Sequence, residues 1–188
     1  MTEREKAEEI LKKHVKTEHF LRHSYAVEAV MRALSRKLEP ENEEEWAIVG
    51  LLHDLDSELV DYMNSPELHG PKTVEILKNE GFGNDKIYHG ILAHNQATKA
   101  GFHNKMDQAV FAADPITGFI NAITLVYIDK KIDSVKVKSI TKRMKETRFA
   151  AGADRDAMKS IEKLGISFPD FAEISLNAMK EISQVLGL

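Results

Sequence analysis

The sequence predicts an all-α protein with a single domain. Apolar residues recur at helical spacing throughout the chain, and no alternating apolar and polar run is bounded by a turn pair such as Asn-Gly or Asp-Gly. The chain has 188 residues, of which 43% are apolar and 30% are charged. At this length about 70% of the unfolded surface should be buried, which is enough for a core with an internal site. The composition excludes disordered and collagen-like proteins.

Start and stop signals define the helices of the N-terminal half. Thr2 and Glu5 form a capping-box pattern for a first helix. A second helix keeps its apolar spacing until Pro40, and Asn42 with Glu45 can start a third. A Gly-Pro pair begins the fourth, and two glycines end it. The predicted helices cover residues 2–14, 20–39, 42–54 and 71–81.

The C-terminal half continues the helical pattern. Asn84 or Asp85 caps a fifth helix, and a glycine-containing loop over 99–104 precedes a long apolar segment. Pro169 lies near the first position of the last helix. No internal repeat, linker or low-complexity stretch interrupts the chain. The predicted helices cover residues 84–94, 106–128, 136–148, 154–164 and 168–185.

Cysteine content and charge exclude several classes of protein. The chain has no Cys, which excludes a disulfide scaffold, a Cys-ligated zinc site, an iron–sulfur cluster and a thiol nucleophile. Any metal must therefore be held by His, Asp or Glu. The net charge of −4 argues against a dedicated nucleic-acid-binding protein.

The apolar segment 109–128 raises the question of a membrane span. It contains Asp114 and Pro115, and a central Asp costs about 2.5–3.5 kcal/mol on insertion scales. We therefore interpret it as a buried core helix. The N-terminal residues are charged and lack the apolar region of a secretory signal. We expect a cytoplasmic protein with no membrane partner.

Two segments carry histidines in a helical context. Seven non-polar residues, 46–52, precede His53 and Asp54, and groups buried there should be paired or bind a metal. The alternative is a helix that emerges at the surface with a solvated Asp54. His23 precedes the apolar face of the second helix. His19 and His23 could together bind zinc, but a zincin needs Glu where Phe20 stands.

The long helix carries one polar stripe. Its members, Asp114, Thr117, Asn121 and Thr124, are separated by three, four and three residues and so share a face. This face must point to solvent or to an internal polar site. Alternatively, Asp114 caps a fresh helix that has Pro115 at its first position.

The ordered set of His23, His53-Asp54 and Asp114 resembles the H…HD…D signature of the HD superfamily of metal-dependent phosphohydrolases. The stretches LRHSYAVEAVMRALS, LHGPKTVEIL, ILAHN and AADPITGFINAITLV resemble a family of small predicted HD hydrolases, as does the tail from Ser134 to Met158. The resemblance implies one HD-type multi-helix bundle over 1–188. Its HD core covers about 18–128, and helices over 134–188 pack on it.

The resemblance also implies a ligand set. One divalent ion would be held by His23, His53, Asp54 and Asp114. His69 and His94 match the extra ligands of two-metal HD proteins, in which Asp54 would bridge the ions. The donor types suit Fe, Mn, Zn, Co, Ni or Mg. The unmatched histidines, His14, His89 and His103, are interpreted as surface residues or as residues behind the ligands.

Two positions depart from the family pattern. HDLD stands where many relatives have HDIG or HDIA, and Pro115 stands where close relatives have Glu. Asp56, Glu58 and Asp61 could hold the outer ring nitrogens of ligating histidines. The favoured interpretation is that these acids are solvated at the start of a loop.

The resemblance implies hydrolysis of a small phosphate ester such as a nucleotide, dinucleotide or sugar phosphate. Asp54 is the central catalytic candidate. Lys72, three residues after His69, would share its helix face and neutralise a phosphate. Arg22 lies about 100° around the helix from His23 and is the weaker candidate. The alternative function is a non-catalytic, metal-containing domain that senses a nucleotide.

The segment 130–148 is strongly basic, with eight Lys or Arg residues and two acids. A solvated helix face is the favoured interpretation, because most charge runs face water. If the segment folds over the metal cleft, it would attract anionic substrates. Nucleic-acid binding is the third alternative, and the oligomeric state is open.

Overall fold

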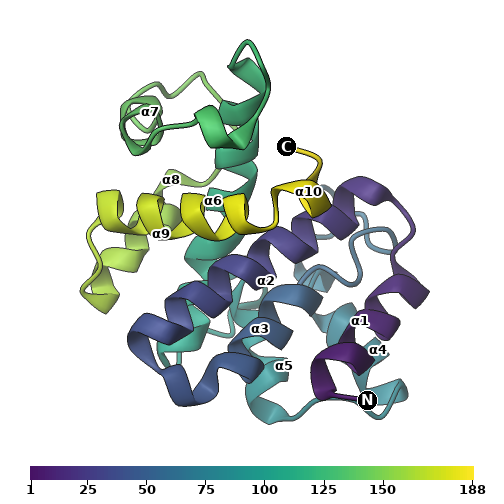
Figure 1. The fold of residues 1–188 in the computed structure, drawn as a ribbon. Coiled ribbons are helices and arrows are strands. Elements are labelled where there is room, and N and C mark those ends of the chain that lie inside the picture. The colour runs from purple at the N-terminus through teal and green to yellow at the C-terminus, as the bar shows by residue number, and fades with distance from the viewer.

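The computed structural model describes residues 1–188 as ten α-helices with no strand, which confirms the all-α prediction. Figure 1 shows α9 lying across α6, with α1, α3, α4 and α5 gathered at the other end of the bundle from α7. Five short 3-10 turns join them, at Pro40–Asn42, Pro66–Leu68, Gln96–Thr98, Ile132–Ser134 and Ser160–Leu164. The helices are α1 Glu3–His14, α2 Glu18–Leu38, α3 Glu43–Leu52, α4 Pro71–Asn79, α5 Asp85–Ala93, α6 Lys105–Val126, α7 Val137–Arg143, α8 Arg155–Lys159, α9 Phe168–Glu181 and α10 Ser183–Leu186.

The capping residues act largely as their sequence positions predict. Thr2 and Glu5 form the capping box of α1. The Asn84 side chain accepts hydrogen bonds at the start of α5, and Pro169 lies in the first turn of α9. Asn42 precedes α3 but makes no side-chain cap. Side-chain caps are present at five of the ten helix starts, those of α1, α5, α6, α8 and α9.

The predicted helix 136–148 is wrong in its second half, because α7 ends at Arg143. The backbone after it forms turns, and Ala150 has a positive φ of 43°. The guanidinium of Arg155 donates to five carbonyl oxygens, those of Met144, Glu146, Phe149, Ala150 and Ala153. One side chain thus satisfies carbonyl groups that a helix would have paired internally.

Helix α6 is the central element of the core. It contacts α2, α5, α8 and α9, and Ile116, Phe119 and Ile120 on it are fully buried. By length and composition it could cross a membrane, but 61% of its apolar window is buried inside the fold, as a core helix requires. The helix runs through Pro115 without a break, so the alternative in which Asp114 caps a fresh helix is wrong.

Helices α2 and α3 cross closely at Gly50. A Cβ atom at this position would lie 2.9 Å from the carbonyl oxygen of Val27 and 3.0 Å from the Cα of Glu28. Only glycine permits this approach without a shift of one helix. The crossing brings the middle of α2 beside the C-terminal end of α3.

The C-terminal helices share the core of the preceding helices. One hydrophobic cluster extends from Ala7 on α1 to Leu186 on α10, and α9 packs on both α2 and α6. Figure 1 shows α7 and the turns around it projecting from the bundle beside the C-terminal part of α6. The bundle therefore has one continuous core and one projecting lobe.

Candidate metal centre

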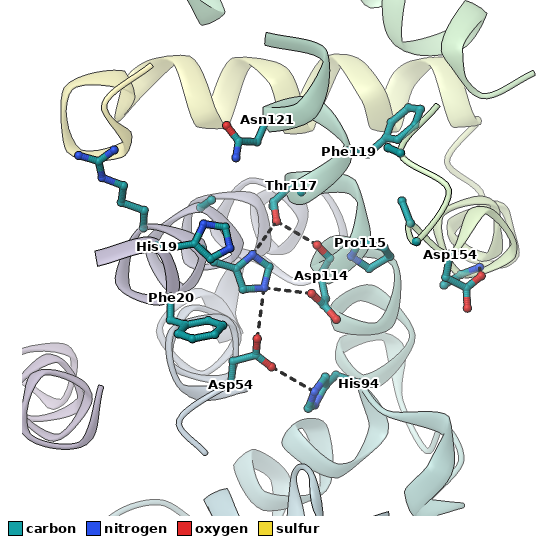
Figure 2. A pocket seen from close by; sticks show the side chains of 18 of the residues that line it. His19, Phe20, Asp54, His94, Asp114, Pro115, Thr117, Phe119, Asn121 and Asp154 are labelled. Atoms are coloured by element: carbon teal, nitrogen blue, oxygen red, sulfur yellow. Dashed lines mark hydrogen bonds and ion pairs between the residues drawn. The ribbon is translucent and has the colours of Figure 1, made fainter. Parts of the chain in front are cut away.

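Five elements bring the predicted ligands together. His23 lies on α2, His53 and Asp54 follow the last turn of α3, and Asp114 lies on α6. His69 follows the 3-10 turn Pro66–Leu68, and His94 ends α5. Figure 2 shows Asp54, His94 and Asp114 converging on one end of the cleft. All six predicted ligand side chains meet there, although they are spread over 92 positions of the chain.

The first group of potential ligands consists of His23, His53, Asp54 and Asp114. The Nε2 atom of His23 lies 3.0 Å from Asp114 Oδ1, 3.5 Å from Asp54 Oδ2 and 3.2 Å from His53 Nε2. His53 Nε2 lies 3.7 Å from Asp114 Oδ1. Neighbouring ligands around one ion with bonds of about 2.1 Å are separated by roughly 3–3.5 Å, so the spacing suits a divalent ion.

The second group shares Asp54 with the first. Asp54 Oδ1 lies 3.1 Å from His69 Nε2 and 3.5 Å from His94 Nε2. The two histidine Nε2 atoms are 2.9 Å apart. Asp54 Oδ2 thus faces His23, while Oδ1 faces His69 and His94 and also lies 3.5 Å from His53 Nε2, so the carboxylate contacts both groups.

Hydrogen bonds to the outer ring nitrogens orient the four imidazoles. His53 Nδ1 lies 2.8 Å from the carbonyl oxygen of Gly50, and His94 Nδ1 bonds to the carbonyl oxygen of Ile91. A carbonyl oxygen only accepts, so each Nδ1 carries the proton and each Nε2 is available to a metal. In both bonds the carbonyl oxygen belongs to the residue three positions earlier, in the last turn of the helix.

His23 is oriented by the polar stripe on α6. The Thr117 hydroxyl donates to the carbonyl oxygen of Asp114 at 2.9 Å, so it can accept from His23 Nδ1 at 3.3 Å. Figure 2 shows Thr117 and Asp114 on the same side of α6, with Asn121 further along it. The Thr124 hydroxyl donates to the carbonyl oxygen of Ile120, and Thr124 does not line the cleft.

Charges in the group favour a bound cation. Burial opposes a charge on His53, but the carboxylates of Asp54 and Asp114 outweigh it and raise the pKa of His53 to about 9. Burial likewise opposes a charge on His69, yet Asp54 and Asp56 raise its pKa to about 10. Burial would raise the pKa values of Asp54 and Asp114, but the imidazoles hold both below their usual range.

The donor set fits a divalent metal. Four Nε2 atoms and two carboxylates face one another. The Nε2 atoms of His23 and His53 are 3.2 Å apart, and those of His69 and His94 are 2.9 Å apart. With each Nδ1 protonated, two facing Nε2 lone pairs repel each other unless a cation or a proton lies between them. Imidazole and carboxylate donors without thiolate suit Mn, Fe, Co, Ni and Zn. Ligation itself remains a prediction.

A family model for the HD domain matches residues 20–119. This range is more than half of the chain and holds all six candidate ligands. The chain belongs to the HD domain family. No curated protein and no solved structure matches it. The cluster of His and Asp side chains in this HD domain fits the divalent metal dependence that is general in the family.

Asp56 has a role in this HD domain that the sequence analysis disfavoured. We expected a solvated carboxylate, but Asp56 is fully buried. It accepts from His69 Nδ1 at 2.7 Å and from the backbone N–H groups of Gly70 and Thr73. Asp56 therefore orients a candidate ligand from behind. Glu58 instead accepts from the backbone at Lys16 and Thr17, and Asp61 accepts from Asn64.

Lys72 does not reach the centre in the structure. Its Nζ donates to Glu75 at 2.8 Å on the exposed side of α4, and it does not line the cleft. The helical spacing from His69 does not apply, because His69 and Gly70 precede the first turn of α4. Arg22, the weaker candidate, lines the cleft beside its ion-pair partner Glu18.

A cleft of about 1030 Å³ opens onto the candidate centre. Figure 2 shows Phe20 near Asp54, with Phe119 and Asp154 on the far side of α6 from His19. Residues from the first turns of α2 and from α10 both line the cleft, although they are distant in the sequence. None of the eight cations in 130–148 lines it, so the basic segment does not form a funnel over the candidate centre. The lining includes His19, Phe20, Arg22, Tyr62, Asn95, Gln96, Asn121, Ala153 and Leu186.

Proposed function

We propose that this HD domain protein is a divalent metal-dependent phosphohydrolase that acts on a small phosphate ester. The single observation that carries the proposal is the convergence of four Nε2 atoms and the carboxylates of Asp54 and Asp114 at the end of a wide cleft. Two groups that share Asp54 support two ions. The small phosphorylated substrate and the cytoplasmic location remain predictions from the sequence.

The candidate ligands would hold the metal as follows. His23, His53, Asp54 and Asp114 would bind one ion, and Asp54, His69 and His94 would bind a second. A bound divalent ion lowers the pKa of a coordinated water toward about 7 and polarises a phosphoryl oxygen. Asp56, Thr117 and the carbonyl oxygens of Gly50 and Ile91 keep the imidazoles in the ligating orientation.

The rest of the cleft would bind the ester. Arg22 is the cation of the cleft lining, with its guanidinium next to Glu18 and Gly187, so it would bind a phosphate oxygen and release Glu18. Asn121 offers an amide group to a polar leaving group, whereas the Asn95 amide is already bonded to the carbonyl oxygens of Pro66 and His69. Phe20, which lines the cleft near Asp54, would exclude water and pack against the body of the substrate.

A turnover screen tests the proposal. The metal-free protein should gain activity with at least one of Mn, Fe, Co, Ni, Zn and Mg on nucleoside monophosphates, dinucleotides or sugar phosphates. Asp54→Ala should abolish both turnover and most metal binding, because it removes the ligand that both groups share. Asp61→Ala is the matched control, since Asp61 is an exposed carboxylate in the following loop. Tight nucleotide binding with no turnover under any metal would instead support the sensing domain.

A further inference from the structure

A third group of potential ligands lies outside the candidate metal centre. His89 is on α5, His103 is in the loop before α6, and Asp107 is in the first turn of α6. One nitrogen or oxygen from each lies within 4.8 Å of the others. Asp107 precedes Asp114 by seven residues, which is about 10 Å along the helix. The group shares no residue with the candidate centre.

Buried atoms without partners mark this group. Asp107 is fully buried, and its Oδ2 accepts from His89 Nδ1 at 2.8 Å and from the backbone N–H of His103 at 2.8 Å. Its Oδ1 is buried and has no hydrogen-bond partner, and neither has Nε2 of His89. Buried polar atoms are nearly always partnered. The unpartnered Oδ1 therefore indicates that the Asp107 carboxylate can bind a further polar or charged group, whereas Nε2 of His89 points away from Asp107 across its ring.

Two of the three donors are spaced nearly as ligands. His89 Nδ1 and Asp107 Oδ2 are 2.8 Å apart, a hydrogen-bond distance slightly below the roughly 3–3.5 Å between adjacent ligands on one ion, so a small outward shift of the ring would admit an ion. The His103 ring stacks on His89, with centroids 3.8 Å apart and planes at 18°. A ring nitrogen binds metal in the plane of its ring, so His103 must rotate out of the stack to ligate. It is exposed, and its ring makes no hydrogen bond that would prevent this rotation.

We propose that His89, Asp107 and His103 bind a divalent transition-metal ion such as zinc, cobalt or nickel at a structural site. The ion would take the place of the proton between His89 Nδ1 and Asp107 Oδ2, and that proton would pass to solvent. The unpartnered Oδ1 of the same carboxylate would bind the ion as well, and water would complete its coordination. Two imidazoles and one carboxylate are typical donors for these ions. The site would fasten the 99–104 loop to α5 and α6, the helices that position His94 and Asp114.

Metal stoichiometry tests this proposal independently of the proposed function. Zinc or cobalt is titrated into metal-free protein in two backgrounds, wild type and Asp54→Ala, each with and without His103→Ala. We expect His103→Ala to remove one equivalent of tightly bound ion in both backgrounds. In Asp54→Ala, zinc at a hundred times its Kd should raise Tm by about 5–10 °C, and His103→Ala should abolish that shift.

Two further variants complete the test. Asp107→Asn should remove the same equivalent, whereas His14→Ala should not, because His14 pairs with Glu80 away from both groups. Equal stoichiometry with and without His103→Ala in both backgrounds would overturn the proposal. The proposal would also be overturned if Asp54→Ala, without His103→Ala, removed this equivalent of ion, because the ion would then belong to the candidate centre. Turnover by His103→Ala with its catalytic metal restored should equal that of wild type.

Discussion

Individual side chains behind the candidate ligands decide whether this HD domain can hold a metal. Asp56 never faces the cleft, yet its buried carboxylate accepts three hydrogen bonds and orients His69. Thr117 does the same for His23 through a hydroxyl whose proton is already committed to the backbone. Such partners raise the basicity of a ligand and fix its ring.

We expect Asp56→Asn to lower metal affinity by about 10–100-fold, the usual effect of removing a carboxylate behind a ligating histidine. The amide cannot carry the negative charge that holds a proton on His69 Nδ1. Isothermal titration of the metal-free protein measures the change. Asp61 lies in the same loop and accepts hydrogen bonds from Asn64 alone. The variant Asp61→Asn should therefore bind metal with wild-type affinity. An unchanged affinity in Asp56→Asn would show that His69 is not a ligand.

Arg22 and Lys72 form a matched pair of cations for a second test. Arg22→Ala should raise KM about tenfold or more, because a charge-assisted bond to phosphate contributes about 1.5–3 kcal/mol. Lys72→Ala should change KM less than twofold, since Lys72 pairs with Glu75 outside the cleft. Steady-state kinetics and metal content are measured for both. If Lys72→Ala raised KM more than Arg22→Ala did, Lys72 would be the residue that binds the phosphate, as its sequence position predicts.

At the scale of elements, the crossing of α2 and α3 aligns the first ligand group. His23 lies on one helix and His53 at the end of the other, and their Nε2 atoms are 3.2 Å apart. Gly50 makes this approach possible, since a Cβ there would lie 2.9 Å from a backbone oxygen of α2. A backbone atom cannot move aside as a flexible side chain would.

Gly50→Ala should therefore destabilise the protein by about 1–3 kcal/mol and weaken metal binding, because one helix must shift. Gly118→Ala is the control on α6, where a Cβ would meet nothing within 4 Å. In a helix interior that change should stabilise by about 0.5–1 kcal/mol. Urea unfolding gives both values. If Gly118→Ala destabilised the protein as much as Gly50→Ala did, the close crossing would not be the cause.

At the scale of the whole molecule, the candidate centre links stability to pH and to metal. Without metal, the raised pKa values of His53 and His69, about 9 and 10, stabilise the fold fully below about pH 6.5. This contribution is lost as pH rises through those values. Asp54 and Asp114 have lowered pKa values, so their contribution is present above about pH 3.8 and is lost as pH falls further.

The metal-free protein should therefore be most stable between about pH 4 and 6.5 and should lose stability toward pH 9–10. Metal affinity should rise over that upper range, because an ion replaces the protons on Nε2. Urea unfolding at pH 6 and pH 9, with chelator and with added metal, measures both trends. If the free energy of unfolding of the chelated protein rose from pH 6 to pH 9, His53 and His69 would not be protonated in the metal-free protein.

Most of the helices and several of their caps could be predicted from the sequence, because apolar periodicity and capping residues are local features. The candidate ligands came from the resemblance to the HD superfamily, which depends on the linear order of His and Asp. The tertiary structure alone decided the rest. It showed Asp56 buried behind His69, Lys72 turned away, Arg22 in the cleft and the basic lobe outside it. Helical spacing predicts a shared face only within one helix, and His69 lies before α4 begins. Burial and convergence depend on contacts between distant segments, which no spacing along the chain specifies.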